Sequence, residues 1–79
     1  GEDKLLVTAQ QALDEKDYQW AATLTDYLLA LDPNAAEPKM IKADALIGIA
    51  ENMLTATGRN YMLSYALELK EEADVSSRK

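Results

Sequence analysis

Apolar residues recur every three or four positions along almost the whole chain, and this spacing constrains the fold more than any other feature. Residues spaced in this way share one face of an α-helix, which makes about 3.6 residues per turn. No segment alternates apolar and polar residues as a half-buried strand does, and no glycine-rich phosphate loop is present. The sequence therefore predicts an all-α fold.

Polar breaks divide the first half of the chain into two helical segments. The first is predicted at residues 3–15. Asp17 is well placed to cap the second segment, because its carboxylate can accept hydrogen bonds from the free backbone amides at a helix start. The second segment is expected to end at Asp32-Pro33, since proline cannot continue the hydrogen-bond ladder. The short connection between the two segments predicts an antiparallel hairpin.

Two further helices are predicted in the second half. Asn34 is expected to cap the third, with Pro38 in its first turn, where a missing N–H costs little. Gly58 is expected to adopt a left-handed conformation before the fourth helix at residues 59–74. The tail at residues 73–79 is expected to fray.

The apolar stripes of these segments supply both a predicted core and a surplus. The candidate core residues are Leu5, Ala9, Trp20, Ala21, Leu24, Leu28, Ala43 and Ile47. The last two helices are apolar on more than one side, which predicts a surface covered by a partner. The candidate interface residues are Met53, Leu54, Tyr61, Tyr65 and Leu69. For Trp20 a core position is favoured, whereas for the two tyrosines core and interface positions remain equally open.

Composition argues against the commonest catalytic and binding sites. The 79 residues include no His and no Cys, the side chains that supply most ligands of zinc, haem and iron–sulfur sites. Ser–His and Cys–His nucleophilic chemistry is excluded with them. A net charge of −6 disfavours nucleic acid and anionic membranes. We therefore expect no catalytic residue, cofactor, metal, nucleic acid or membrane for this chain.

Two groups of polar residues can be interpreted as functional sites or, more simply, as residues of turns and helix starts. Asp32, Asn34 and Glu37 could suggest a cation site, but the segment lacks the glycine and distal glutamate of a calcium loop. Turn and cap residues are the favoured interpretation. Arg59 beside Asn60 could orient a sulfate or a neighbouring domain, although an ordinary pair at a helix start is favoured.

The first hairpin has the spacing of a tetratricopeptide-type repeat. Ala9, Asp17-Tyr18, Ala21 and Asp32-Pro33 occupy the repeat's positions. The alanines would let the helices cross closely, and the proline would end the unit. A second unit keeps Ala43 but lacks the Asp-Tyr turn. The sequence thus predicts a four-helix, TPR-like helical-hairpin bundle and not a long array.

Two segments give the chain a resemblance to a known family. DYQWAA at residues 17–22, followed by an apolar helix ending in Asp32-Pro33, resembles the dimerisation domain of alkylsulfatases with a metallo-β-lactamase-fold catalytic domain. RNYMLSYALEL at residues 59–69 resembles the segment that closes that domain. Departures lie at Ala50 and Gly58, where the family usually has Gly and Trp. The resemblance covers about residues 5–70.

The resemblance implies that residues 1–79 form one helical dimerisation domain, matching the later part of the family's helical domain, within a larger multidomain, zinc-dependent alkylsulfatase. An upstream catalytic domain would hold two zinc ions and hydrolyse alkyl sulfate esters, and a downstream domain of lipid-binding type would offer an apolar surface. The helical domain would join two subunits as a homodimer. Many relatives are bacterial and exported, which implies a periplasmic or secreted enzyme. The residues alone leave open a free-standing TPR-like adaptor that binds a peptide.

Overall fold

Each of the four apolar segments folds as one helix in the computed structural model, which describes residues 1–77. The helices are α1 (Glu2–Asp14), α2 (Tyr18–Leu31), α3 (Ala36–Glu51) and α4 (Ala56–Ser77). No strand occurs among the described residues. The prediction of an all-α fold with four helices is confirmed, whereas the likeness to a tetratricopeptide unit stays a prediction.

The turn between α1 and α2 forms as the sequence predicts. The Asp17 side chain accepts a hydrogen bond from the Trp20 amide at 3.4 Å and caps α2. Just before it, Lys16 adopts a left-handed conformation with φ of 65°. The Asp17 amide then donates to the Ala12 carbonyl at 2.8 Å, which closes the end of α1. The chain reverses within three residues, and α1 and α2 pack as a hairpin.

The start of α3 differs from the prediction. Asn34 does not cap the helix: the N-cap position is Ala35, which makes no side-chain cap hydrogen bond. Instead, the Asn34 amide donates to the Asp32 carboxylate at 3.1 Å. This Asx turn places Asn34 in the connection that precedes the helix. Pro38 lies in the first turn of α3, as expected.

Both ends of α4 also differ from the predicted helix at residues 59–74. The helix begins at Ala56, so Gly58 is helical, and no described glycine has a positive φ. The α3–α4 connection is closed by Arg59, whose guanidinium donates to the Met53 carbonyl at 2.9 Å. At the other end, α4 continues to Ser77 and Ala73 is buried, so residues 73–77 are an ordered part of the helix, not a frayed tail. Residues 78–79 of the expected tail lie outside the described residues.

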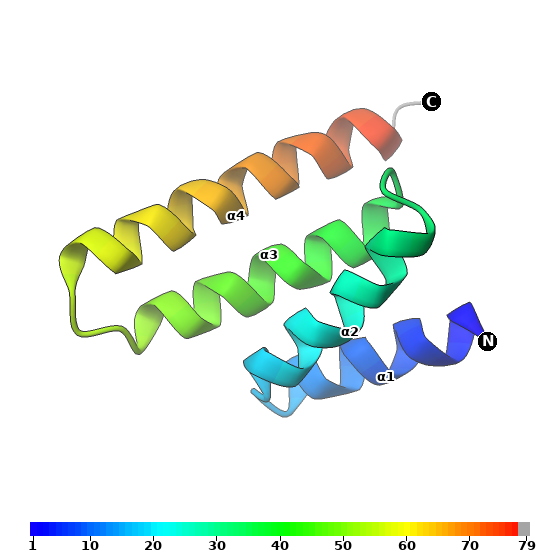
Figure 1. Ribbon diagram of the computed structural model, residues 1–79, viewed down its shortest axis with the longest axis horizontal. Helices are drawn as coiled ribbons and strands as arrows, with labels where there is room; N and C mark the ends of the chain where they lie inside the picture. The colour runs from blue at the N-terminus through cyan, green and yellow to red at the C-terminus, as the bar shows by residue number, and fades with distance from the viewer. Residues whose placement is uncertain (78–79) are drawn as a thin grey trace.

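The helix α3 lies at the centre of the molecule (Figure 1), with the α1–α2 hairpin against one side and α4 against another. Within residues 1–77, α4 packs on α3 alone. This position explains why α3 is apolar around much of its circumference. Ile41 and Ala45 face the first hairpin, while Ala43 and Leu46 face α4.

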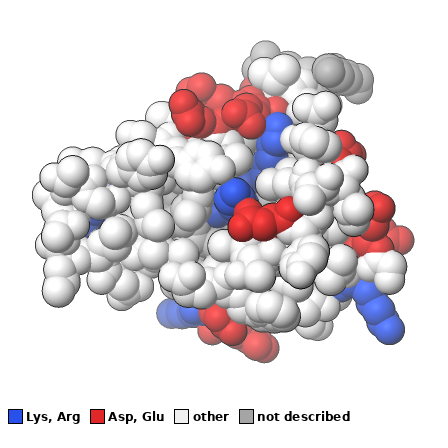
Figure 2. All heavy atoms as spheres, viewed as in Figure 1, with Lys and Arg blue, Asp and Glu red and all other residues white. Residues whose placement is uncertain are grey.

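The α3–α4 hairpin extends beyond the turn of the α1–α2 hairpin (Figure 1). We call residues 45–67, at this end, the hairpin tip. It contains only two charged residues, Glu51 and Arg59. The same end is almost entirely uncharged on the face shown in Figure 2, whereas acidic and basic groups lie over the middle of the molecule and the opposite end.

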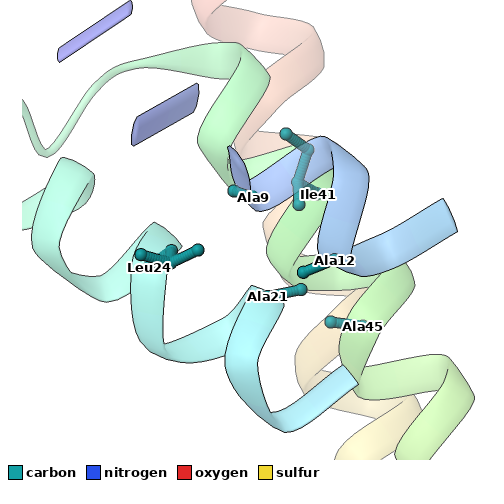
Figure 3. Close-up of a cluster of buried hydrophobic side chains, with 6 residues drawn as sticks. All are labelled: Ala9, Ala12, Ala21, Leu24, Ile41 and Ala45. Carbon is teal, nitrogen blue, oxygen red and sulfur yellow. The ribbon is translucent and has the colours of Figure 1, made fainter. Parts of the chain in front are cut away.

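The core consists of two clusters with different side-chain sizes. Small residues predominate where α1, α2 and α3 meet (Figure 3), in the cluster Ala9, Ala12, Ala21, Leu24, Ile41 and Ala45. Between α3 and α4 the cluster is Ala43, Leu46, Ala66 and Leu69. Alanines at the first junction allow the helix backbones to approach closely, so bulky side chains must lie elsewhere.

The structure places most of the predicted core residues inside and one outside. Those buried are Ala9, Ala21, Leu24, Leu28 and Ala43. Leu5 and Ile47 are partly buried against the two clusters. Trp20, however, is 48% exposed and is not a core residue. The buried stripe of α2 passes through Ala21, and an indole could not fit where the alanines of α1 and α2 meet.

Candidate association surface

Two lysines of α3 fix the positions of the helices on either side of it. Lys42 Nζ lies 2.8 Å from the Asp26 carboxylate on α2 and donates to the Tyr65 hydroxyl on α4 at 3.1 Å. One turn earlier, the mostly buried Lys39 forms an ion pair with Glu72 of α4 at 3.1 Å. These contacts hold α4 in register with α3.

Lys42 remains charged in this setting. Burial alone disfavours the ammonium form, but the hydrogen bonds to Asp26 and Tyr65 outweigh it and raise the pKa of Lys42 above its ordinary value. The ammonium group also lies 5.1 Å from the centre of the Tyr65 ring. Tyr65 is therefore committed to an internal contact and keeps only part of its surface, 37%, exposed.

The hairpin tip presents apolar side chains that the chain itself does not cover. Leu54 is 98% exposed, Tyr61 75% and Leu67 60%. Leu63 is also exposed. Isolated apolar residues on a surface are ordinary, but several on one almost uncharged segment indicate a surface for a partner.

The predicted interface residues separate into three groups. Leu54 and Tyr61 lie on the free surface of the tip. Met53 is partly buried, and Tyr65 contacts Lys42. Leu69 is only 4% exposed and packs between α3 and α4, so it is a core residue and cannot contact a partner. The interface itself stays a prediction.

Sequence reasoning did not single out Leu63 and Leu67 as surface residues. The buried stripe of α4 runs through Met62, Ala66, Leu69 and Ala73, which are spaced by three or four residues. Leu63 and Leu67 are each one position beyond a member of this stripe and are thereby turned away from it. Buried and exposed apolar residues of α4 can be told apart only if the stripe that faces α3 is known, and the sequence offers several such stripes.

A second exposed apolar stripe follows α2. Trp20, Tyr27 and Leu31 share one side of the helix and are 48%, 65% and 62% exposed. Carboxylates flank this stripe at both ends, Asp17 at the start of α2 and Asp32 at its end. The α2 stripe is thus a second candidate surface with a more acidic border than the hairpin tip.

A shallow hollow of about 240 Å³ lies between α1, the end of α2 and the start of α3. Leu6 and Leu28 line it together with carboxylates that include Glu2 and Glu37. None of the described residues that line it has a hydroxyl or amino side chain. In residues 1–77, no group of three or more His, Cys, Asp and Glu side chains is arranged to hold a metal ion. None of the helices described combines the length and apolar character needed to cross a membrane.

Four helices that leave apolar side chains exposed on the hairpin tip and on α2 define an all-α domain with surfaces suited to contact with another protein chain. The model of the alkyl sulfatase dimerisation family matches residues 1–72. The chain belongs to this family, and the resemblance of its two quoted segments is confirmed.

Individual relatives carry alkylsulfatase names. A linear primary-alkylsulfatase of a Pseudomonas species is 35% identical over 78 residues, which cover 96% of this chain and 15% of the relative. An (R)-specific secondary-alkylsulfatase of Pseudomonas is 31% identical over 70 residues, 89% of this chain and 11% of the relative. An alkyl/aryl-sulfatase of Saccharomyces cerevisiae is 30% identical over 71 residues, 90% of this chain and 11% of the relative. The chain thus spans only a small part of the length of these relatives. No solved structure matches it.

Proposed function

We propose that this chain is the non-catalytic association module of an alkylsulfatase and joins two subunits of that enzyme. The observation that carries the proposal is membership of the alkyl sulfatase dimerisation family over residues 1–72. The exposed apolar side chains of the hairpin tip support it, because a self-associating domain needs a surface that loses water when a partner binds.

The size of the domain supports association as well. A chain of this length buries about 60% of its unfolded surface, and the resulting stability is marginal. Here the largest side chain buried almost completely is that of Thr25, and many core positions are alanine. Burial of additional apolar area against a partner would therefore stabilise the fold.

For the enzyme that the module serves, we propose a zinc-dependent hydrolase of alkyl sulfate esters with separate catalytic and lipid-binding-type domains. The names of the matched relatives support the sulfatase part of this proposal. The zinc ligands would belong to the catalytic domain, because His, the usual zinc ligand, is absent from this chain.

Sedimentation velocity over a concentration series tests the association. The 8.7 kDa chain is expected to sediment as a dimer at micromolar concentration and to dissociate on dilution. A monomer at every concentration would contradict the proposal and favour a peptide-binding adaptor. The enzymatic part is tested on a longer protein that carries this segment. Its hydrolysis of a linear alkyl sulfate should be lost on chelation and restored by zinc.

A further inference from the structure

The distribution of charge limits where two copies of this chain can meet. The chain has 14 acidic and 8 basic residues, and all but one of each kind lie outside the hairpin tip. The net charge of −6 therefore belongs to the rest of the molecule, and the tip is neutral. Two identical chains that approach through their acidic parts repel each other, whereas two tips can meet without that cost.

Building on the proposed function, we propose that two copies of this chain associate tip to tip about a two-fold axis, with Leu54 and Tyr61 in the contact. Leu54 is almost fully exposed in the α3–α4 connection, and Tyr61 lies in the second turn of α4. Both are on the end of the molecule that projects beyond the α1–α2 hairpin (Figures 1 and 2), so a second copy can reach them without a clash with that hairpin.

The tip is self-complementary in charge and open to a second copy. In a two-fold contact both copies use the same surface, so if one residue contacts a second residue of the partner, the second also contacts the first. A surface with one acid and one base can therefore pair with itself. Glu51 and Arg59 are such a set. A standard interface takes about 800 Å² from each partner, a modest part of the 5272 Å² surface of this chain. The part of the tip around the α3–α4 connection projects beyond the α1–α2 hairpin (Figure 1), so it is open to a second copy.

The α2 stripe is the competing surface, and its border argues against self-association. Asp17 and Asp32 flank it, and the hollow near its end is lined by Glu2, Asp3 and Glu37. Two copies facing each other through Trp20, Tyr27 and Leu31 would bring these five carboxylates together, and Lys4 and Lys16, which adjoin them in the sequence, would offset their charge only in part. The stripe is nevertheless a suitable control, because Tyr27 and Leu31, 65% and 62% exposed, are about as accessible as Leu67 of the tip, which is 60% exposed.

The test compares Leu54→Glu with Tyr27→Glu by sedimentation velocity, with circular dichroism to verify that both variants fold. Each substitution places a carboxylate on an exposed side chain, 98% and 65% accessible, so neither should disturb the monomer. We expect Leu54→Glu to raise the dimer dissociation constant about 30-fold or more, and Tyr27→Glu to change it less than about threefold. Tyr61→Glu should act like Leu54→Glu.

The possible outcomes distinguish the proposed contact surface, the hairpin tip, from the proposed association function. A wild-type dimer that Tyr27→Glu weakens and Leu54→Glu does not would overturn the tip assignment and leave the association function intact. A wild-type monomer at all concentrations would overturn both. A mixture of Leu54→Glu and Leu54→Lys chains tests the two-fold arrangement: it should associate more tightly than either variant alone. Failure of the mixture to associate would exclude a contact in which the two tips face each other.

Discussion

Replacement of Gly48 by alanine gives the sharpest test of how the first hairpin packs on α3. Gly48 is buried within α3, opposite the ring of Tyr18 at the start of α2. A methyl group at this position would lie 2.6 Å from Tyr18 Cε2 and closer still to Cζ and Cε1. All three atoms belong to a rigid ring, so the clash cannot be relieved by rotation of a flexible side-chain end.

Two effects of opposite sign decide the magnitude. Alanine favours a helix interior over glycine by about 1 kcal/mol. Overpacking against a rigid neighbour costs about 2–3 kcal/mol, in the upper part of the usual range. We therefore expect Gly48→Ala to lower the free energy of unfolding by about 1–2 kcal/mol. In a Tyr18→Ala background the clash is absent, and the same substitution should raise that free energy by about 1 kcal/mol.

Urea unfolding followed by circular dichroism measures all four chains of this double-mutant cycle, at one protein concentration so that association contributes equally. Gly58→Ala is the matched control. Its methyl group would approach Met53 Cε and Thr55 Oγ1 at 2.8 Å, and the ends of these side chains can move. This control should show no loss of stability. The reasoning is refuted if Gly48→Ala stabilises the wild type, or if its effect is the same with and without the Tyr18 ring.

Two further predictions concern the contacts of α4. Lys42→Met should lower the free energy of unfolding by about 1 kcal/mol, because Asp26 is partly exposed and the ion pair is only partly desolvated. Because the folded pKa of Lys42 is raised above its ordinary value of 10.5, the contribution of Lys42 to stability is complete below that value and is lost as pH rises through the folded pKa. The difference between wild type and Lys42→Met should thus stay constant from about pH 6 to 9 and shrink at higher pH, and a constant difference up to about pH 12 would contradict this linkage. Leu69→Ala should cost about 2–4 kcal/mol in chemical unfolding, whereas Leu54→Ala in the dissociated monomer should change stability by less than about 0.5 kcal/mol, and similar losses would mean that Leu69 is not buried as described.

The number and order of the helices could be predicted because apolar spacing, the Asp17 cap and the Asp32-Pro33 break all indicate the same structure. The start of a helix is harder to predict where two polar residues compete to form the local hydrogen bond. Asp32 and Asn34 can each form a local hydrogen bond, and the Asx turn at Asp32 moved the start of α3 to Ala36. Nothing in the local pattern decides such a competition.

The side of a helix that faces its neighbour was the least predictable feature. In α2 the stripe through Trp20 and the stripe through Ala21 share Leu24, so both agree with helical spacing. The choice depends on how closely α1 approaches, and the buried alanines of α1 bring it too near for an indole. In α4 the sequence predicts the same role for Leu69 and Tyr61, although only Leu69 lies on the side facing α3. These outcomes are set by tertiary packing and not by local propensity.

The order of packing along the chain has a consequence for how this domain folds. Each helix packs mainly on the helix that precedes or follows it in the sequence, and α4 has α3 as its one neighbour among the described helices. Contacts between segments close in sequence require only short loops to close, so folding is expected on the microsecond to millisecond scale. The last helix contributes no residue to the cluster between the first three. Amide protons of α4 should therefore exchange with solvent faster than those of α3, the helix packed from both sides.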